Sequence, residues 1–360
     1  MVLVAYFHYN SYSYYKMNRV NVLMLFGGES SEHEVSIASA RNVYDAIDTE
    51  KYKTYLVFID KTGRWYVVDS FEDIDDNTKM SPVAPVFGSN HFSIIGKGDT
   101  INPDVIFPIL HGINGEDGSV QAVAQLLHTP VVGCDMTSSA ICMDKVFSKQ
   151  LLEQNGIKTV PYVVHMSGED LFDFDDLVSK LGNKLFVKPA NGGSSVGVSK
   201  VENKEDFEDA VKKAHVFDDK VLIERALEAR ELEVSVLGSG SEIKASGAGE
   251  IIPDRDFYDY DSKYDPKSKT LADIPAKLSE EVSKNIAPIA IKVYKTLGCS
   301  GLARVDFFLT KEDELFVNEI NTIPGFTDIS MYPKLWQQEG LSYRELIDEL
   351  IRDALAKAKI

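Results

Sequence analysis

The sequence contains few cysteines, no long apolar run and no excess of positive charge. Its three cysteines, Cys134, Cys142 and Cys299, are an odd number without the spacing of metal ligands. We therefore expect free thiols in a reducing compartment, packed as small hydrophobic side chains. No apolar run approaches the roughly 18 residues of a membrane span, and residues 1–7 lack the positive charges that open a signal peptide. These absences predict a cytoplasmic protein without a membrane partner.

Acidic residues outnumber basic ones by 56 to 38, which gives a formal net charge of -18. A protein of this charge repels nucleic acid and anionic membranes, so neither is expected as a partner. Any anionic substrate must be met by a local cluster of cations. The length of 360 residues is large for one hydrophobic core and predicts two or three domains.

The first part of the chain has the pattern of an open α/β domain, expected over residues 18–136. Residues 21–26 are continuously apolar and end in two glycines, as a buried parallel strand does when it enters a loop. Alternating elements follow, with strands expected over 52–60 and 104–110 and helices over 34–47 and 118–127. Residues 1–17 show no period that leads into this domain and are expected to be a disordered leader.

Two further units are predicted downstream, a smaller domain over 137–235 and a C-terminal one over 236–360. The first is expected to contain helices over 138–155 and 204–215 and strands over 185–189 and 221–225. The second is expected to contain strands over 232–237 and 243–251, a long helix over 275–297, a hairpin and a helix from residue 342. Residues 253–272 have no periodic pattern, and a loop of that length is expected to be a functional lid.

The hairpin, within residues 302–333, is the most informative segment. Side chains two apart share a face of a strand, which places on one side Arg304, Asp306, Phe308, Val317, Glu319 and Asn321. A two-residue loop at 312–313 sets Asp306 opposite Glu319, and the same register sets Arg304 opposite Asn321. Opposed like charges destabilise a sheet, and a divalent cation such as Mg²⁺ would balance them. A solvated hairpin face is the alternative.

Residues 188–197 (KPANGGSSVG) follow an apolar strand and have the composition of a phosphate-binding loop. The glycines let backbone N–H groups approach phosphate oxygens, and the serine hydroxyls add donors. Lys188 precedes the glycines, so the segment is not a Walker A motif. A glycine-serine turn without a ligand is the alternative.

Two loops at predicted strand ends carry histidine and acidic residues. Gly27 to His33 follows the first strand, and His111 to Gly118 follows a later one. Ligands of open α/β sheets bind at such strand ends. A helix N-terminus favours an anion, whereas Glu32 could hold an ammonium group. Either histidine alone is more often structural, but together the loops predict one pocket for a small zwitterion.

These motifs resemble the D-alanine-D-alanine ligase family of the ATP-grasp superfamily over residues 19 to 355. The segments that carry the resemblance are GGESSEHEVS, LHGINGEDGSVQ, SSAICMDK, VKPANGGSSVGV, LIERALEARELEV, FYDYDSKY, GLARVDFF and VNEINTIPGFT. The resemblance implies an α/β fold in which an N-terminal open Rossmann-like domain precedes a two-lobed ATP-grasp fold. It also implies ATP-dependent joining of two D-alanines through an acyl phosphate, with release of ADP and phosphate, for peptidoglycan synthesis.

The resemblance assigns roles to individual residues. It implies that ATP is bound by Lys145, Lys188, Ser195, Glu224, Leu227, Glu231 and Lys263. It implies that the two D-alanines are bound by Glu32, His111, Tyr264, Arg304 and Ser330. Its catalytic set is Glu32, Ser194, Tyr264, Arg304 and the backbone N–H of Gly325. Its ligands for two Mg²⁺ or Mn²⁺ ions are Asp306, Glu319 and Asn321.

The resemblance leaves three alternatives open. One is a depsipeptide-forming ligase that takes D-lactate as second substrate, although Tyr264 matches the residue that accompanies D-alanine in the family. Another is a non-catalytic nucleotide-binding protein, although such a protein is expected to have lost metal ligands or phosphate-binding lysines. The third is an ATP-grasp ligase for larger carboxylates. The resemblance also allows a homodimer.

Overall fold

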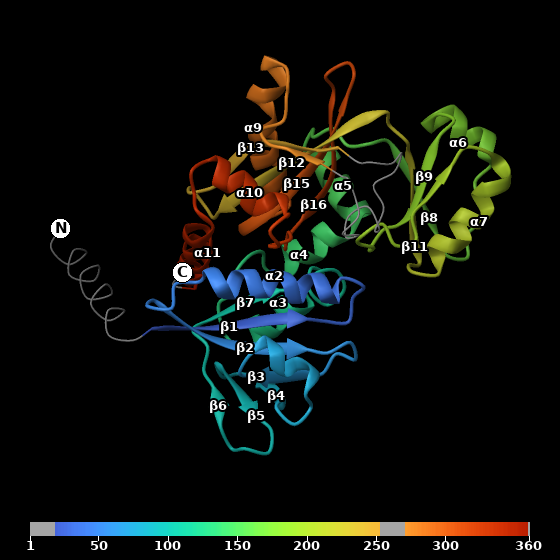
Figure 1. The fold of residues 1–360 in the computed structure, drawn as a ribbon. Coiled ribbons are helices and arrows are strands. Elements are labelled where there is room, and N and C mark those ends of the chain that lie inside the picture. The colour runs from blue at the N-terminus through green and yellow to red at the C-terminus, as the bar shows by residue number, and fades with distance from the viewer. Residues whose placement is uncertain (1–18, 253–270, 359–360) are drawn as a thin grey trace.

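The computed structural model describes residues 19–252 and 271–358, which form three β-sheets with helices packed on them (Figure 1). The expectations for the leader, for most of the lid and for Lys263 and Tyr264 lie outside the described residues. Among the described residues, no helix combines the length and apolar character needed to cross a membrane.

The first sheet has the strand order β6-β5-β4-β3-β2-β1-β7. Its parallel strands are β1 (Val20–Gly27), β2 (Tyr52–Ile59) and β7 (Val105–Ile109), and its helices are α2 (His33–Ala46) and α3 (Ser119–Leu126). Alternate residues of β1 enter two separate cores, Met24 on the side of α2 and Leu25 on the side of α3. This explains why the predicted strand is continuously apolar.

The sequence did not predict the antiparallel half of this sheet. Its elements are β3 (Trp65–Val68), the 3₁₀ helix Phe71–Asp75, β4 (Ser81–Val86), β5 (His91–Ile94) and β6 (Thr100–Ile101). Pro82 and Pro85 lie within β4. Proline is rare in strand interiors, so this strand carries only a weak sequence signal.

The second sheet is antiparallel, with the order β10-β9-β11-β8. Its elements are β8 (Tyr162–Met166), α6 (Phe174–Leu181), β9 (Leu185–Pro189), β10 (Ser199–Val201), α7 (Lys204–His215) and β11 (Lys220–Arg225). Helices α6 and α7 share a hydrophobic core with β9 and β11. The glycine-serine loop joins β9 to β10, at the point where the sequence predicted it.

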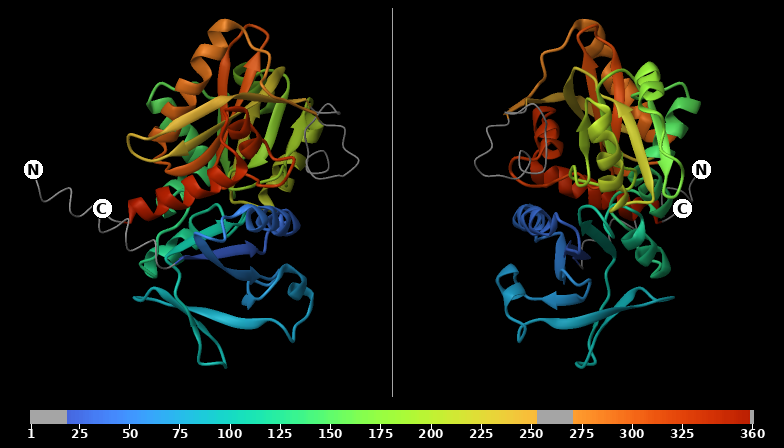
Figure 2. Two further views of the ribbon diagram at one scale, coloured as in Figure 1. Left: turned by 60° about the vertical axis from the view of Figure 1, so that its left-hand side comes forward. Right: turned by 90° about the vertical axis from the view of Figure 1, so that its right-hand side faces the viewer.

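The third sheet has the order β14-β13-β12-β15-β16 and is also antiparallel. Its strands are β12 (Ala229–Gly238), β13 (Lys244–Ile252), β14 (Leu271–Asp273), β15 (Gly301–Thr310) and β16 (Leu315–Asn321). The accompanying helices are α4 (Met136–Met143), α5 (Lys145–Gln154), α9 (Glu280–Thr296), α10 (Met331–Gln338) and α11 (Tyr343–Lys357). Helix α11 lies between the first and third sheets and contacts both (Figure 2).

The single helix expected over 138–155 is two helices, so that expectation was wrong. Asp144 separates them, and its side chain accepts hydrogen bonds from the backbone N–H groups of Val146 and Phe147, each at 3.0 Å. A carboxylate at this position caps the next helix. The break fixes Lys145 as the first residue of α5.

The expected register of the hairpin is correct at the site, although the expected turn was wrong. Thr310 N–H donates to Glu314 O at 3.1 Å, so the loop has three residues, and Asp313 takes a positive φ of 59°. A β-bulge before Glu319 then shifts the register by one residue, which restores the pairing of Asp306 with Glu319. Because of the bulge, Val317 is buried in the core, not on the face of Glu319 as predicted.

The cysteines are free and buried, as the sequence predicted. Cys142 on α4 and Cys299 before β15 place their sulfur atoms 3.5 Å apart, and both belong to the core of the third sheet. Burial raises the pKa of the Cys142 thiol. These side chains therefore serve as packing groups at neutral pH.

Candidate active site

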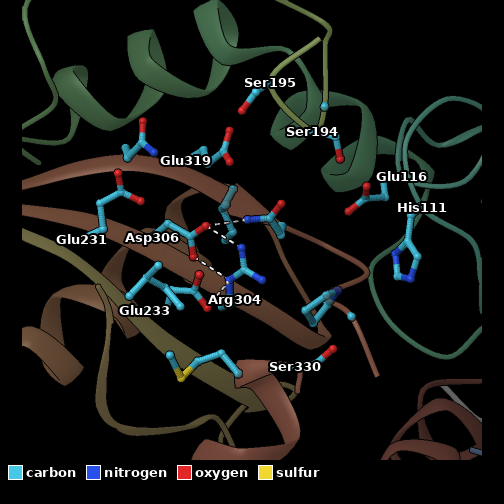
Figure 3. A pocket seen from close by; sticks show the side chains of 18 of the residues that line it. His111, Glu116, Ser194, Ser195, Glu231, Glu233, Arg304, Asp306, Glu319 and Ser330 are labelled. Atoms are coloured by element: carbon cyan, nitrogen blue, oxygen red, sulfur yellow. Dashed lines mark hydrogen bonds and ion pairs between the residues drawn. The ribbon is translucent and has the colours of Figure 1, made fainter. Parts of the chain in front are cut away.

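A pocket of about 1380 Å³ lies where the three sheets meet, and it gathers the predicted site residues that the structure describes. The first sheet contributes Glu32 and His111. The second sheet and the helix before it contribute Lys145, Lys188, Ser194, Ser195, Glu224 and Leu227. The third sheet and its loops contribute Glu231, Arg304, Asp306, Glu319, Asn321, Gly325 and Ser330. Figure 3 shows how acidic side chains surround Arg304 on one side, with His111 on the other.

The glycine-serine loop and Lys145 form one wall of the pocket. Lys145 Nζ donates to Gly192 O at 2.6 Å and lies 3.3 Å from Glu319 Oε2. The loop also approaches the first sheet, because a Cβ at Gly193 would lie 3.6 Å from Glu32 Oε2. This lysine therefore links the loop to the predicted metal carboxylates.

Behind this wall lies a buried cluster of three charges. Lys149 Nζ and Lys188 Nζ each lie 2.5 Å from a different oxygen of Glu224. Only 1% of the Lys149 side chain and 3% of the Glu224 side chain are exposed. Burial would raise the pKa of Glu224, but the two ammonium groups outweigh it and lower that pKa. The cluster has a net charge of +1 and lies next to the glycine-serine loop.

Arg304 on β15 is held by two carboxylates, Asp306 of the same strand and Glu233 of the neighbouring strand β12. Its Nε and Nη2 atoms donate to the two oxygens of Asp306, each at 2.7 Å, and Nε lies 3.0 Å from Glu233 Oε2 on β12. Asn321 Nδ2 also donates to Asp306, at 2.9 Å. Burial would lower the pKa of Arg304, but the carboxylates more than offset it and raise that pKa. The guanidinium stays charged and fixed in direction.

Two groups from the first sheet titrate unusually. His111 Nδ1 lies 3.1 Å from the carbonyl of Ile323, so this nitrogen must carry the hydrogen. Burial lowers the pKa of His111, and the ring is neutral at pH 7. Glu116, beside it in Figure 3, accepts from Gly112 N–H at 2.8 Å. Burial and repulsion from Glu32 raise the pKa of Glu116 to about 8.

The loop after β16 brings backbone to the pocket. A Cβ at Gly325 would lie 2.7 Å from Ser330 Oγ, so a larger residue does not fit without movement. Ser330 Oγ accepts from Thr327 N–H at 2.9 Å, which closes the loop on itself. The structure therefore places Gly325 and Ser330 side by side on the wall of the pocket.

Sequence reasoning missed Glu233, Glu116 and Lys149. Glu233 pairs directly with Asp306 across β12 and β15, and its alternation with Glu231 was a signal of one polar face. Glu116 was part of a quoted motif but received no role. Lys149 carried no signal, because a lysine in a helical pattern indicates an exposed position.

Comparisons with known proteins find the same family along most of the chain. A family profile described as D-ala D-ala ligase N-terminus matches residues 21–134, and one described as D-ala D-ala ligase C-terminus matches residues 151–352. The chain is 47% identical to the D-alanine--D-alanine ligase of Oceanobacillus iheyensis, over 93% of this chain and 94% of that protein. It is 45% identical to D-alanine--D-alanine ligase A of Salmonella typhimurium, over 95% and 97%.

Solved structures give the same result. The D-alanine-D-alanine ligase of Coxiella burnetii superposes with a TM-score of 0.86 at 37% identity, covering 95% of each chain. The VanG D-Ala:D-Ser ligase of Enterococcus faecalis superposes with a TM-score of 0.85 at 35% identity, covering 93% of this chain and 99% of that one.

Proposed function

Because this chain belongs to the D-alanine-D-alanine ligase family and has its ATP-grasp fold, we propose that it joins two D-alanine molecules at the expense of ATP. The product would be D-alanyl-D-alanine, with ADP and phosphate released, for peptidoglycan precursor synthesis. The observation that carries the proposal is the meeting of two kinds of group in one pocket. Glu32 and His111 fit a small amino acid, and Lys145 with the glycine-serine loop fits phosphates.

Activation of the first D-alanine requires its carboxylate to attack the γ-phosphorus of ATP. The ammonium of this D-alanine fits the Glu32 carboxylate, which is 8% exposed. Lys145, which donates to Gly192 O of the loop, and Lys188, at the start of the loop, would neutralise phosphate charge as the acyl phosphate forms. The buried +1 charge of the Lys149, Lys188 and Glu224 cluster adds to this field.

The second D-alanine attacks the acyl phosphate with its free amine and forms a tetrahedral oxyanion. Arg304 is a cation held in direction by carboxylates, and Gly325 lines the same pocket. Together they would stabilise the oxyanion, and Ser330 and Arg304 would receive the second carboxylate. Donors that are already held in position do not have to rearrange during the reaction, so they stabilise the oxyanion without a reorganisation cost.

The residues at Asp306, Glu319 and Asn321 fit a hard divalent cation by their chemistry, since all three offer oxygen atoms. Among the described residues, no three His, Cys, Asp or Glu side chains converge on one point, so the protein would supply only part of the coordination shell, as is usual for Mg²⁺ with phosphates. When bound, two Mg²⁺ or Mn²⁺ ions would neutralise phosphate charge. Asn321 would have to turn its amide oxygen toward the ion, because Nδ2 faces Asp306 here.

The test is phosphate release from ATP and Mg²⁺ with D-alanine, with L-alanine, and with D-alanine plus D-lactate or D-serine, and products identified by mass. Phosphate release with D-alanyl-D-alanine as product, and none with L-alanine, is expected. No D-alanine-dependent release refutes the proposal. A depsipeptide or a D-alanyl-D-serine product in preference to the dipeptide refutes the choice of second substrate and the role of Tyr264.

Three further expectations are part of the same proposal. We propose cytoplasmic action, which the free thiols support, and a homodimer, which light scattering tests. We also propose the division into units at 18–136, 137–235 and 236–360. The last of these boundaries falls inside strand β12 (Ala229–Gly238); limited proteolysis tests whether the chain is cut there or before the strand.

A further inference from the structure

The turn between α7 and β11, residues 216–219, touches both ends of the glycine-serine loop. At the first end, Asp218 Oδ2 accepts hydrogen bonds from the backbone N–H of Asn191 at 2.7 Å and from Asn191 Nδ2 at 2.9 Å. At the other end, Phe217 packs on Gly197, where an added Cβ would lie 2.7 Å from Phe217 Cδ2. The turn therefore acts as a clamp, defined here as Phe217 and Asp218.

The loop between these ends has an uncommon backbone. Ser194 and Ser195 have positive φ angles of 50° and 60°, a region that residues other than glycine seldom adopt. Short turns within the loop are closed by Val196 N–H to Gly193 O at 3.1 Å and Val198 N–H to Ser195 O at 3.3 Å. Such a conformation persists when neighbouring groups hold it in place.

Asp218 is itself held by two further contacts. Its Oδ1 accepts from Lys220 N–H at 3.0 Å, and its carbonyl lies 2.9 Å from His215 Nδ1. A carbonyl only accepts, so His215 Nδ1 carries the hydrogen, and His215 Nε2 is left to accept from His165 Nδ1 at 2.9 Å. His165 is buried in β8, with 3% exposure. The clamp is thus tied to the interior of the second sheet through His215 and His165.

We propose that Asp218 is a positioning residue for ATP. By holding Asn191, while Phe217 holds Gly197, it orders the loop before ATP arrives, with N–H and hydroxyl groups ready for the phosphates. A binding loop that is already ordered loses less conformational entropy on binding. Hydrogen bonds to a carboxylate are strong enough for this task. The inference rests on the proposed function of the loop as a phosphate site.

The test compares Asp218→Ala with Asp219→Ala. Asp219 is the next residue, is exposed, and its replacement removes the same charge. Asp218→Ala should raise the ATP Kd, measured by calorimetry without D-alanine, and the KM for ATP by about tenfold, the effect of losing one charged hydrogen bond. It should change kcat much less, whereas Asp219→Ala should leave Kd, KM and kcat unchanged. Equal ATP affinity in the two variants overturns the proposal.

A double-mutant cycle separates positioning from general destabilisation. If Asp218 acts through Asn191, the effect of Asp218→Ala on ATP affinity should be smaller in the Asn191→Ala background, where only the backbone N–H of residue 191 still donates to Asp218. Full additivity overturns the proposal. Should Asp218→Ala not fold, Asn191→Ala alone must still weaken ATP binding, since it removes the Nδ2 bond from an exposed loop residue. Calorimetry with ATP alone distinguishes failure of the clamp from failure of the ligase assignment, because it requires no turnover.

Discussion

Replacing Glu224 by glutamine tests whether the buried charge cluster exists as described. The change keeps the shape of the side chain but removes the only negative charge between Lys149 and Lys188, whose ammonium groups both lie 2.5 Å from it. The Lys149 and Lys188 side chains are 1% and 12% exposed, so water compensates little. Removing one partner of a buried pair costs about 3 to 5 kcal/mol. That is a large part of the roughly 5 to 15 kcal/mol that keeps a typical protein folded.

The loss should depend on pH in a defined direction. Burial already lowers the pKa of Lys149, and without Glu224 that pKa should fall further. The folded variant then binds fewer protons than the unfolded chain, so its stability rises with pH. Urea denaturation followed by circular dichroism should show a deficit at pH 7 that shrinks at pH 9. Adding Lys149→Met to Glu224→Gln should recover much of the loss, because one of the two uncompensated charges disappears.

Glu228→Gln is the matched control, because it breaks an exposed ion pair with Lys311 (3.4 Å) and should change stability little. A Glu224→Gln protein as stable as the wild type at pH 7 would show that these side chains do not form a buried charged cluster. A deficit that does not change with pH would show that Lys149 is not the group that carries the excess charge.

Three further predictions concern the pocket. Arg304→Met should lower kcat by about 10² to 10³, the cost of one oxyanion donor, and an unchanged kcat in the phosphate-release assay would remove Arg304 from that role. Glu116 has a pKa of about 8 in the folded protein and its ordinary pKa of 4.5 in the unfolded chain. Between these pH values only the folded protein keeps the proton, so the stability of the wild type should fall as pH rises. Glu116→Gln should flatten this slope in melting curves from pH 5 to 9; an unaltered slope would assign it to another group. Asn321→Ala should raise the Mg²⁺ concentration for half-maximal activity by about tenfold, and an identical Mg²⁺ titration would exclude Asn321 as a ligand.

Parts of this molecule whose sequence signal is local could be predicted without the structure. The strand at Val20–Gly27 is apolar throughout because its two faces enter different cores. The loops at its end and around His111 follow from glycine and strand position. The helix start at Lys145 was missed although Asp144, a good capping residue, preceded it.

Parts that depend on distant pairing could not be predicted. Glu233 joins the site only because β12 pairs with β15, about 70 residues later in the chain. Lys149 is one helical turn beyond Lys145, and only the packing of α5 against β11 shows that it is buried on Glu224. The clamp at Asp218 likewise connects segments on either side of α7.

The β-bulge in β16 determines which residues must be copied when this site is built into another protein. A regular hairpin with the same residues and a two-residue turn would place Val317 beside Glu319 and turn Asn318 toward the core. With the bulge, Asn318 and Glu319 both line the pocket and Val317 stays inside. The segment that must be copied as a whole is therefore the irregular strand together with its three-residue turn. Copying Asp306, Glu319 and Asn321 alone onto another scaffold would reproduce the residue types but not the directions in which their side chains point.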